Sequence, residues 1–241
     1  MIAKERRLPV GKREAQGSPS TQVIIAALNE EEGIGPTIVE LKANLASPRV
    51  LVVDGRSTDR TVEIAKSMGA DVVLQDGLGK GDAIAKAIEY SDLSVDYVVI
   101  TDADYTYPAE HVPEMIRILE KNPDVGMVCG NRFSGYQDVK GLNYAFYLGN
   151  RLIGFAQNFL NGIWLADPLT GLRVLRAEIL RCWKVESKGF DVEVELNHHV
   201  KLEGFGIAEV PIKYRERLGE KKLEARHGIE IFRRIILEAT H

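Results

Sequence analysis

The stretch VVITDADYTYPAE, residues 98–110, begins as an apolar, β-branched run and continues into two aspartates one residue apart, Asp102 and Asp104. The run predicts a buried β-strand that ends near Thr101. Two carboxylates at one strand end repel each other unless a divalent cation lies between them. Because Mg²⁺ and Mn²⁺ prefer carboxylate oxygens and keep phosphate oxygens as further ligands, the pattern indicates a metal that holds a diphosphate.

Short apolar runs and helical patterns alternate on both sides of this stretch, from residue 22 to residue 130. This order predicts an α/β fold, with a mostly parallel central sheet flanked by helices. Strands are expected at 22–28, 50–54, 71–75, 97–101 and 126–130, and helices at about 34–45, 58–68, 80–90 and 110–121.

Polar clusters follow the expected strands, at the sheet edge where such folds bind their ligands. They occupy residues 29–32, 54–59, 76–82, 102–107 and 131–132. A DxD pattern alone is weak evidence, because chance matches are common and a solvated turn is the alternative. The coincidence of five clusters at one edge is stronger, and the small Ala103 lets the backbone come close to a ligand.

Composition limits the class of protein. The chain has 241 residues, 45% of them hydrophobic, and a net charge of −4, which argues against a general nucleic-acid binder. No apolar run reaches the roughly 18 residues that a membrane span needs. Cys129 and Cys182 lie far apart, and we expect two reduced core thiols in a cytosolic environment.

The loops after the first three strands carry distinct chemistry. The first has Asn29 and Glu30 where a phosphate-binding loop would have glycines, and these side chains can accept hydrogen bonds from a base or ribose. Asp54, at the end of the second strand, can accept from the N–H groups of a base. In the third loop Lys80 lies among glycines and can reach a phosphate or the sugar. Ser57 or Thr58 is expected to cap the helix after the second strand.

Six stretches together resemble the family 2 glycosyltransferases, which have the GT-A fold with a Rossmann-like sheet. They follow the order of the family over about residues 22–176, and RERLGEKKL extends the resemblance toward the end of the chain. The chain is most similar to the polyprenyl-phosphate hexose synthases, which are the dolichyl-phosphate mannose and glucose synthases. The six stretches are VIIAALNEEEGI, VVDGRSTDRT, GLGKGDAIAKAI, ITDADYTYPAE, GNRF and DPLTGLRVLR.

This resemblance implies a metal-dependent, inverting hexosyltransferase. The donor would be GDP-mannose, which we favour, or UDP-glucose, and the cofactor Mn²⁺ or Mg²⁺. The acceptor would be a polyprenyl (dolichyl) phosphate. The alternative acceptor is a hydroxyl group of a lipid-linked sugar, for which Asp191 would be the general base, whereas a phosphate acceptor needs no base.

The resemblance also assigns roles to individual residues. Asp104 would bind the metal, while Asp102 would face the ribose and sugar and also contribute to the metal site. Thr106 stands where the mannose synthases often have glutamine, so the third metal ligand is left open. Nucleotide and sugar binding would fall to Ala27, Asn29, Glu30, Asp54, Lys80, Asp102 and Ala103. Phosphate binding, at the donor or the acceptor, would fall to Arg132, Arg151, Arg217 and Lys222, with Arg132 and Arg217 also counted as catalytic.

The chain is expected to comprise a basic, disordered tail at 1–20, a catalytic domain at 21–225 and a basic amphipathic helix at 226–241. Ile229, Phe232, Ile235 and Ile236 would share one face of that helix. The helix either docks on the core or lies at a membrane surface, where it would precede transmembrane segments. The aromatic region 141–165 is interrupted by glycines and predicts several helical pieces at an apolar site mouth or interface. Both regions favour a peripheral protein on the cytoplasmic face of a membrane.

Two other classes of protein share parts of this pattern. Sugar nucleotidyltransferases have the alternating α/β order, but they need a glycine-rich basic loop after the first strand, where this chain has Asn29 and Glu30. A non-catalytic nucleotide-sugar-binding protein is the second alternative, and the intact Asp102, Asp104 and Arg217 argue against it.

Overall fold

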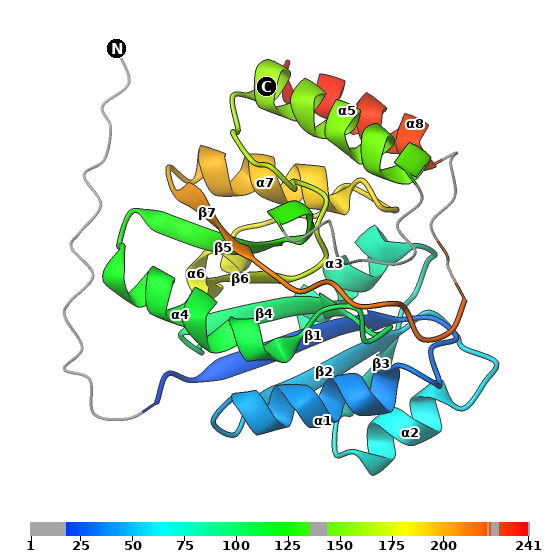
Figure 1. Ribbon diagram of the computed structural model, residues 1–241. Coiled ribbons are helices and arrows are strands. Elements are labelled where there is room, and N and C mark those ends of the chain that lie inside the picture. Colours follow the sequence, from blue (N-terminus) through cyan, green and yellow to red (C-terminus); the bar gives the residue numbers. More distant parts are fainter. Residues whose placement is uncertain (1–17, 135–143, 221, 223–226, 241) are drawn as a thin grey trace.

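A seven-stranded mixed sheet forms the centre of the computed structural model, which describes residues 18–134, 144–220, 222 and 227–240 (Figure 1). The strand order is β3-β2-β1-β4-β6-β5-β7. Only β6 pairs antiparallel with its neighbours among the described strands. The strands are β1 (Thr21–Ala27), β2 (Arg49–Asp54), β3 (Asp71–Leu74), β4 (Tyr97–Asp102), β5 (Val125–Asn131), β6 (Arg173–Arg176) and β7 (Gly206–Pro211).

Helices cover both faces of this sheet. Alternate residues of β1 point to opposite cores, because successive side chains of a strand face opposite sides. Val23 and Ile25 pack in the core that contains α1 and α4, while Ile24 packs in the core that contains α3 and α7. The helices are α1 (Ile34–Asn44), α2 (Thr61–Ser67), α3 (Lys80–Tyr90), α4 (Val112–Lys121), α5 (Tyr144–Asn161), α6 (Ala177–Arg181), α7 (Val192–Leu202) and α8 (His227–Glu238), with a 3₁₀ turn at Ala109–His111.

The mostly parallel α/β fold and the five strands expected between residues 22 and 130 are confirmed, each strand to within one residue at either end. The helix expected at 58–68 begins later, at Thr61. Ser57 and Thr58 do not cap it, because Ser57 bonds to Asp54 and Thr58 to Asn29. The carboxylate of Asp59 instead accepts from the N–H of Thr61, at 2.9 Å.

In the part of the region 141–165 that the structure describes, which begins at residue 144, the helix does not break at the glycines, so the prediction of several helical pieces is wrong there. Residues 144–161 form the single helix α5. Glycine lowers helix stability by about 1 kcal/mol relative to alanine, but burial of an apolar stripe on a neighbouring helix compensates for this cost. Ile153 and Ala156 of α5 supply that stripe, and they pack against Ile231 and Ile235 of α8. The two helices lie side by side above α7 (Figure 1).

The C-terminal helix α8 packs against α5 and α7, and the membrane-surface role of its exposed side stays a prediction. Its predicted apolar face divides, because Ile235 is buried while Ile229, Phe232 and Ile236 are exposed. No helix in the described part of the chain is long and apolar enough to cross a membrane. The expectation of two core thiols is half right, since Cys129 is buried but Cys182 is exposed. The predicted tail at 1–20 lies almost wholly outside the described residues.

Candidate active site

The carboxyl ends of three adjacent parallel strands bring the predicted site residues together. β1 lies between β2 and β4, with Ala27 opposite Asp54 and Ala26 opposite Asp102. Asn29 and Glu30 follow β1 directly. Parallel strands end at the same edge of a sheet, so the three loops meet where α/β folds bind their ligands.

Asp54 connects the loops after β1 and β2. Its carboxylate is fully buried and accepts from the N–H of Ser57 at 2.9 Å and from the Ser57 hydroxyl at 2.6 Å. The Ser57 hydroxyl in turn accepts from the N–H of Asn29, and the Asn29 side chain accepts from the N–H of Thr58. Asp54 therefore shapes the expected nucleoside pocket through a turn, since both of its oxygens already accept hydrogen bonds.

Asp104 and Glu30 share one cationic partner, Arg217. The Arg217 guanidinium lies 2.8 Å from Asp104 Oδ2 and also pairs with Glu30 Oε1. Lys222 Nζ lies 3.6 Å from the same Glu30 oxygen. The other oxygen of Asp104 accepts from the hydroxyl and the N–H of Thr106, at 2.6 and 3.1 Å. Two residues of the late RERLGEKKL stretch thus contact the strand-end carboxylates, and their predicted role in phosphate binding stays a prediction.

The carboxylates of this site lie in an environment that resists their ionisation. Burial, as the largest effect, raises the pKa of Glu30 to about 7, although Arg217 and Lys222 lower it. Burial and the nearby Asp102 also raise the pKa of Asp104, against the opposing effect of Thr106 and Arg217. Burial and the neighbouring carboxylates both disfavour the charged forms, and a bound cation would offset this effect.

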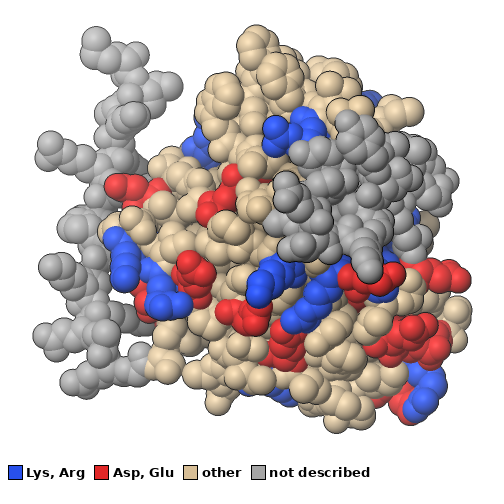
Figure 2. Space-filling model, in the orientation of Figure 1, with Lys and Arg blue, Asp and Glu red and all other residues tan. Residues whose placement is uncertain are grey.

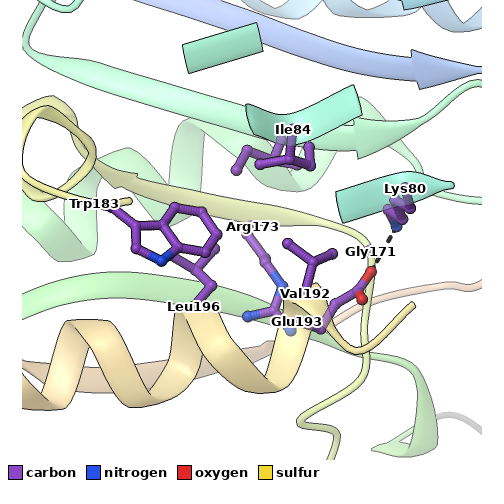
Figure 3. A pocket seen from close by; sticks show the side chains of 9 residues that line it. Lys80, Ile84, Gly171, Arg173, Trp183, Val192, Glu193 and Leu196 are labelled. Carbon is purple, nitrogen blue, oxygen red and sulfur yellow. Dashed lines mark ion pairs between the residues drawn. The ribbon is translucent and has the colours of Figure 1, made fainter. Parts of the chain in front are cut away.

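Lys80 neutralises Asp102 from the opposite side. Its Nζ lies 2.6 Å from Asp102 Oδ1 and 2.7 Å from Glu193 Oε1, at the start of α7 (Figure 3). Sequence reasoning placed Lys80 at the site but gave no role to Glu193. The Glu-Val-Glu alternation at 193–195 was compatible with a strand or a helix, and the structure makes it a helix.

Arg132 lies in a buried, bidentate ion pair with Asp167. Its Nε and Nη2 each lie 2.7 Å from a carboxylate oxygen of Asp167, and its guanidinium packs over the ring of Tyr214. Glu209 accepts from the N–H groups of Ala166 and Asp167 and so holds the same loop. Asp167 had not been assigned a role, although it begins the DPLTG motif that supports the family resemblance.

Two predicted residues lie outside these contacts. Arg151 is exposed on α5, and none of the ion pairs that the described residues make with Asp102, Asp104 or Glu30 includes it. Asp191 precedes α7, where it accepts from the N–H of Gly189 and lies 3.3 Å from Nε of Arg234 on α8. The structure therefore connects Asp191 to the C-terminal helix. The predicted roles of Arg151 in phosphate binding and of Asp191 as a general base stay predictions.

A family model described as glycosyl transferase family 2 matches residues 22–183. The chain belongs to this family. It is 38% identical over 206 residues to a dolichyl-phosphate hexose transferase of Haloferax volcanii, a match that covers 84% of this chain and 86% of that protein. It is 32% identical to the low-salt glycan biosynthesis hexosyltransferase Agl6 of the same organism, over 86% of this chain but only 51% of that protein.

Solved structures support the GT-A fold of this family 2 glycosyltransferase. Glucosyl-3-phosphoglycerate synthase from Mycobacterium tuberculosis, in complex with Mn²⁺, UDP-glucose and phosphoglyceric acid, superposes with a TM-score of 0.73. The match covers 92% of this chain and 80% of that one, at 21% sequence identity. A likeness at this identity supports the fold, while the chemistry must be argued from the residues of this glycosyltransferase.

The residues at the strand end fit a hard divalent cation. Asp102 and Asp104 offer carboxylate oxygens, and each carboxylate is already neutralised by a cationic side chain, Lys80 or Arg217. Glu30 Oε2 is buried and accepts no hydrogen bond from the described residues. The described residues contain no group of three or more potential metal ligands, so phosphate or water oxygens would complete the coordination.

We predict that Asp167→Asn lowers the free energy of unfolding by about 3–5 kcal/mol, because Arg132 would keep a buried charge without its partner. Denaturant unfolding measures this change. Glu63→Gln is the matched control, since it removes the partner of Arg60 from an exposed pair and should leave the stability unchanged. Equal stability of Asp167→Asn and the wild type would contradict the importance of the buried pair.

Proposed function

We propose that this glycosyltransferase transfers a hexose from a nucleotide sugar to the phosphate of a polyprenyl (dolichyl) lipid, with Mn²⁺ or Mg²⁺ as cofactor. The carboxylates of Asp102 and Asp104, surrounded by Lys80, Arg217 and Lys222, are the observation that carries the proposal. The similarity to a dolichyl-phosphate hexose transferase supports the choice of acceptor.

The proposed reaction is a single displacement at the anomeric carbon of the hexose. An oxygen of the lipid phosphate forms a bond to this carbon, the bond to the donor diphosphate breaks, and the nucleoside diphosphate leaves with the electron pair. One displacement inverts the anomeric configuration. A bound Mn²⁺ or Mg²⁺ would supply charge stabilisation to the departing diphosphate. Arg217 and Lys222 lie beside the carboxylates and are the protein groups that would neutralise the same charge.

The donor is proposed to be GDP-mannose, with UDP-glucose as the alternative. The resemblance to mannose synthases favours mannose, whereas the Gly-Lys-Gly sequence at 79–81 is more similar to the glucose synthases. Asn29, Glu30 and Asp54 surround the place where the base and ribose would bind. Because Asp54 already accepts two hydrogen bonds from Ser57, contacts to the base would have to share its oxygens.

The contacts of Asp191 favour a phosphate acceptor over a sugar hydroxyl. A general base must lie within hydrogen-bond reach of the proton it removes. Here the Asp191 carboxylate faces the N–H of Gly189 and the guanidinium of Arg234. These contacts connect Asp191 to α7 and α8. A lipid phosphate is already an anionic nucleophile, so the proposed reaction needs no general base.

The packed pair α5 and α8 is the surface that we propose faces the membrane, on the cytoplasmic side. Many of its outer side chains are apolar, with the charged Arg151, Glu230 and Arg233 among them. In the space-filling view most acidic and basic groups gather over the lower part of the molecule (Figure 2). Apolar helix faces of this kind bind at the boundary between lipid headgroups and acyl chains. The exposed large apolar side chains are Leu148, Leu152, Phe155, Phe159 and Leu160 on α5, and Ile229, Phe232, Ile236 and Leu237 on α8.

Asp104→Asn tests the metal assignment. We expect at least a 100-fold loss of Mn²⁺-dependent hexose transfer to dolichyl phosphate, because the substitution removes a charged ligand of the metal. Transfer from radiolabelled donor into the lipid fraction measures it. Asp71→Asn, at the exposed amino end of β3, should keep wild-type activity. Full activity of the Asp104 variant would rule out the metal role.

Asp191→Asn separates the two acceptors. With a lipid phosphate as acceptor, we expect the variant to turn over within about threefold of the wild-type rate at saturating substrate, since no proton has to be removed. Steady-state transfer assays with dolichyl phosphate measure this rate. A variant that is slower by about 100-fold or more, with the folded fraction unchanged by circular dichroism, would instead identify Asp191 as a base and a hydroxyl group as the acceptor.

A further inference from the structure

Glu193 has one oxygen whose purpose the proposed reaction does not explain. Its side chain is only 8% exposed, and its Oε1 pairs with Lys80 at 2.7 Å. Its Oε2 is buried and has no hydrogen-bond partner among the described residues. A buried carboxylate oxygen without a donor is costly, so the position calls for a ligand that can donate a hydrogen bond.

A small cavity lies beside this carboxylate (Figure 3). Its walls are mostly apolar side chains from α3, β4 and α7, and Glu193, Lys80 and Arg173 are the charged members of the lining. The cavity has room for about one small group, of the size of a water molecule or a hydroxymethyl group. The lining consists of Lys80, Ile84, Ile100, Gly171, Arg173, Trp183, Val192, Glu193 and Leu196.

The cavity adjoins the carboxylate that is expected to face the donor sugar. Lys80 lines the cavity and also pairs with Asp102 at 2.6 Å. Gly171 lines it too, and a Cβ atom at this position would lie 2.3 Å from Asp102 Oδ2. The absence of a side chain at Gly171 therefore lets the Asp102 carboxylate lie directly against the backbone that lines the cavity.

We propose that this cavity binds the C6 hydroxymethyl group of the donor hexose, with Glu193 Oε2 accepting from its hydroxyl. This inference rests on the proposed function and adds a residue that selects the sugar. The apolar walls suit the CH₂ group, and the single acceptor suits the single hydroxyl. A sugar with a carboxylate at C6 is excluded, because its charge would be buried against Glu193. A pentose leaves the cavity unfilled and Glu193 Oε2 without a donor.

Binding of matched donors by calorimetry, with Mn²⁺ present and no acceptor, tests this selection. The pair is UDP-glucose and UDP-xylose, which lacks the hydroxymethyl group. For a chain that binds GDP instead, the pair is GDP-mannose and its 6-deoxy analogue GDP-rhamnose. We expect the wild type to bind the donor with the C6 hydroxyl about tenfold more tightly than the matched donor without it, because one hydrogen bond to a charged group is lost.

Three variants distinguish recognition of the C6 hydroxyl group from a general effect on the structure of α7. Glu193→Met, which removes the acceptor at similar size, should bring the ratio of the two dissociation constants close to one, while the affinity for the nucleoside diphosphate alone stays within about threefold. Val192→Ile, which adds a methyl group to the cavity wall, should weaken the binding of UDP-glucose and leave the binding of UDP-xylose unchanged. Lys201→Gln is the control on the same helix. Lys201 is exposed near the carboxyl end of α7 and does not line the cavity, so the ratio should keep its wild-type value.

The outcomes distinguish this inference from the function on which it rests. A wild-type preference that Glu193→Met and Val192→Ile abolish supports the hydroxymethyl site. Equal binding of both donors by the wild type, or an unchanged preference in both variants, overturns the site and leaves the proposed function standing. If neither UDP nor GDP binds in the presence of Mn²⁺, the proposed function fails and the inference fails with it.

Discussion

The repulsion among carboxylates gathered at one sheet edge is the constraint on which the rest of this structure depends. Parallel pairing of β1 and β4 brings Glu30, Asp102 and Asp104 close together, and burial makes their charges still less favourable. Cationic side chains from distant segments compensate, Lys80 on one side and Arg217 with Lys222 on the other. We propose that the same side chains contact the donor diphosphate when a metal is bound to the carboxylates.

Backbone hydrogen bonds and a buried ion pair also keep this arrangement in place. The N–H of Leu218 donates to the carbonyl of Asp104, and the N–H of Arg215 donates to the carbonyl of Thr106, so the segment that carries Arg217 crosses the strand end as a backbone clamp. Arg132 and Asp167 hold the loop that leads to Gly171 beside Asp102. Buried ion pairs of this kind often add little net stability, so we assign this pair the role of fixing geometry.

The part of the fold that could be predicted from the sequence is the part that local patterns determine. Strands up to residue 130 are continuous apolar runs, and the site residues at their ends follow in the same short segments. By contrast, β6 and β7 are short strands whose pairing with β5 depends on distant segments. Glu193 could not be assigned because its partner, Lys80, lies far away in the sequence. For α5 the glycines indicated breaks, and packing against α8 outweighed them.

The central claim is that the strand-end carboxylates bind a nucleoside diphosphate through a divalent cation. Calorimetric titration of the protein with GDP-mannose and with UDP-glucose, in Mn²⁺ and again in EDTA, tests it most directly. The account predicts that one of the two donors binds with Mn²⁺ and that chelation weakens this binding by 100-fold or more. Binding of equal strength in EDTA, or no binding of either donor with Mn²⁺, would contradict it.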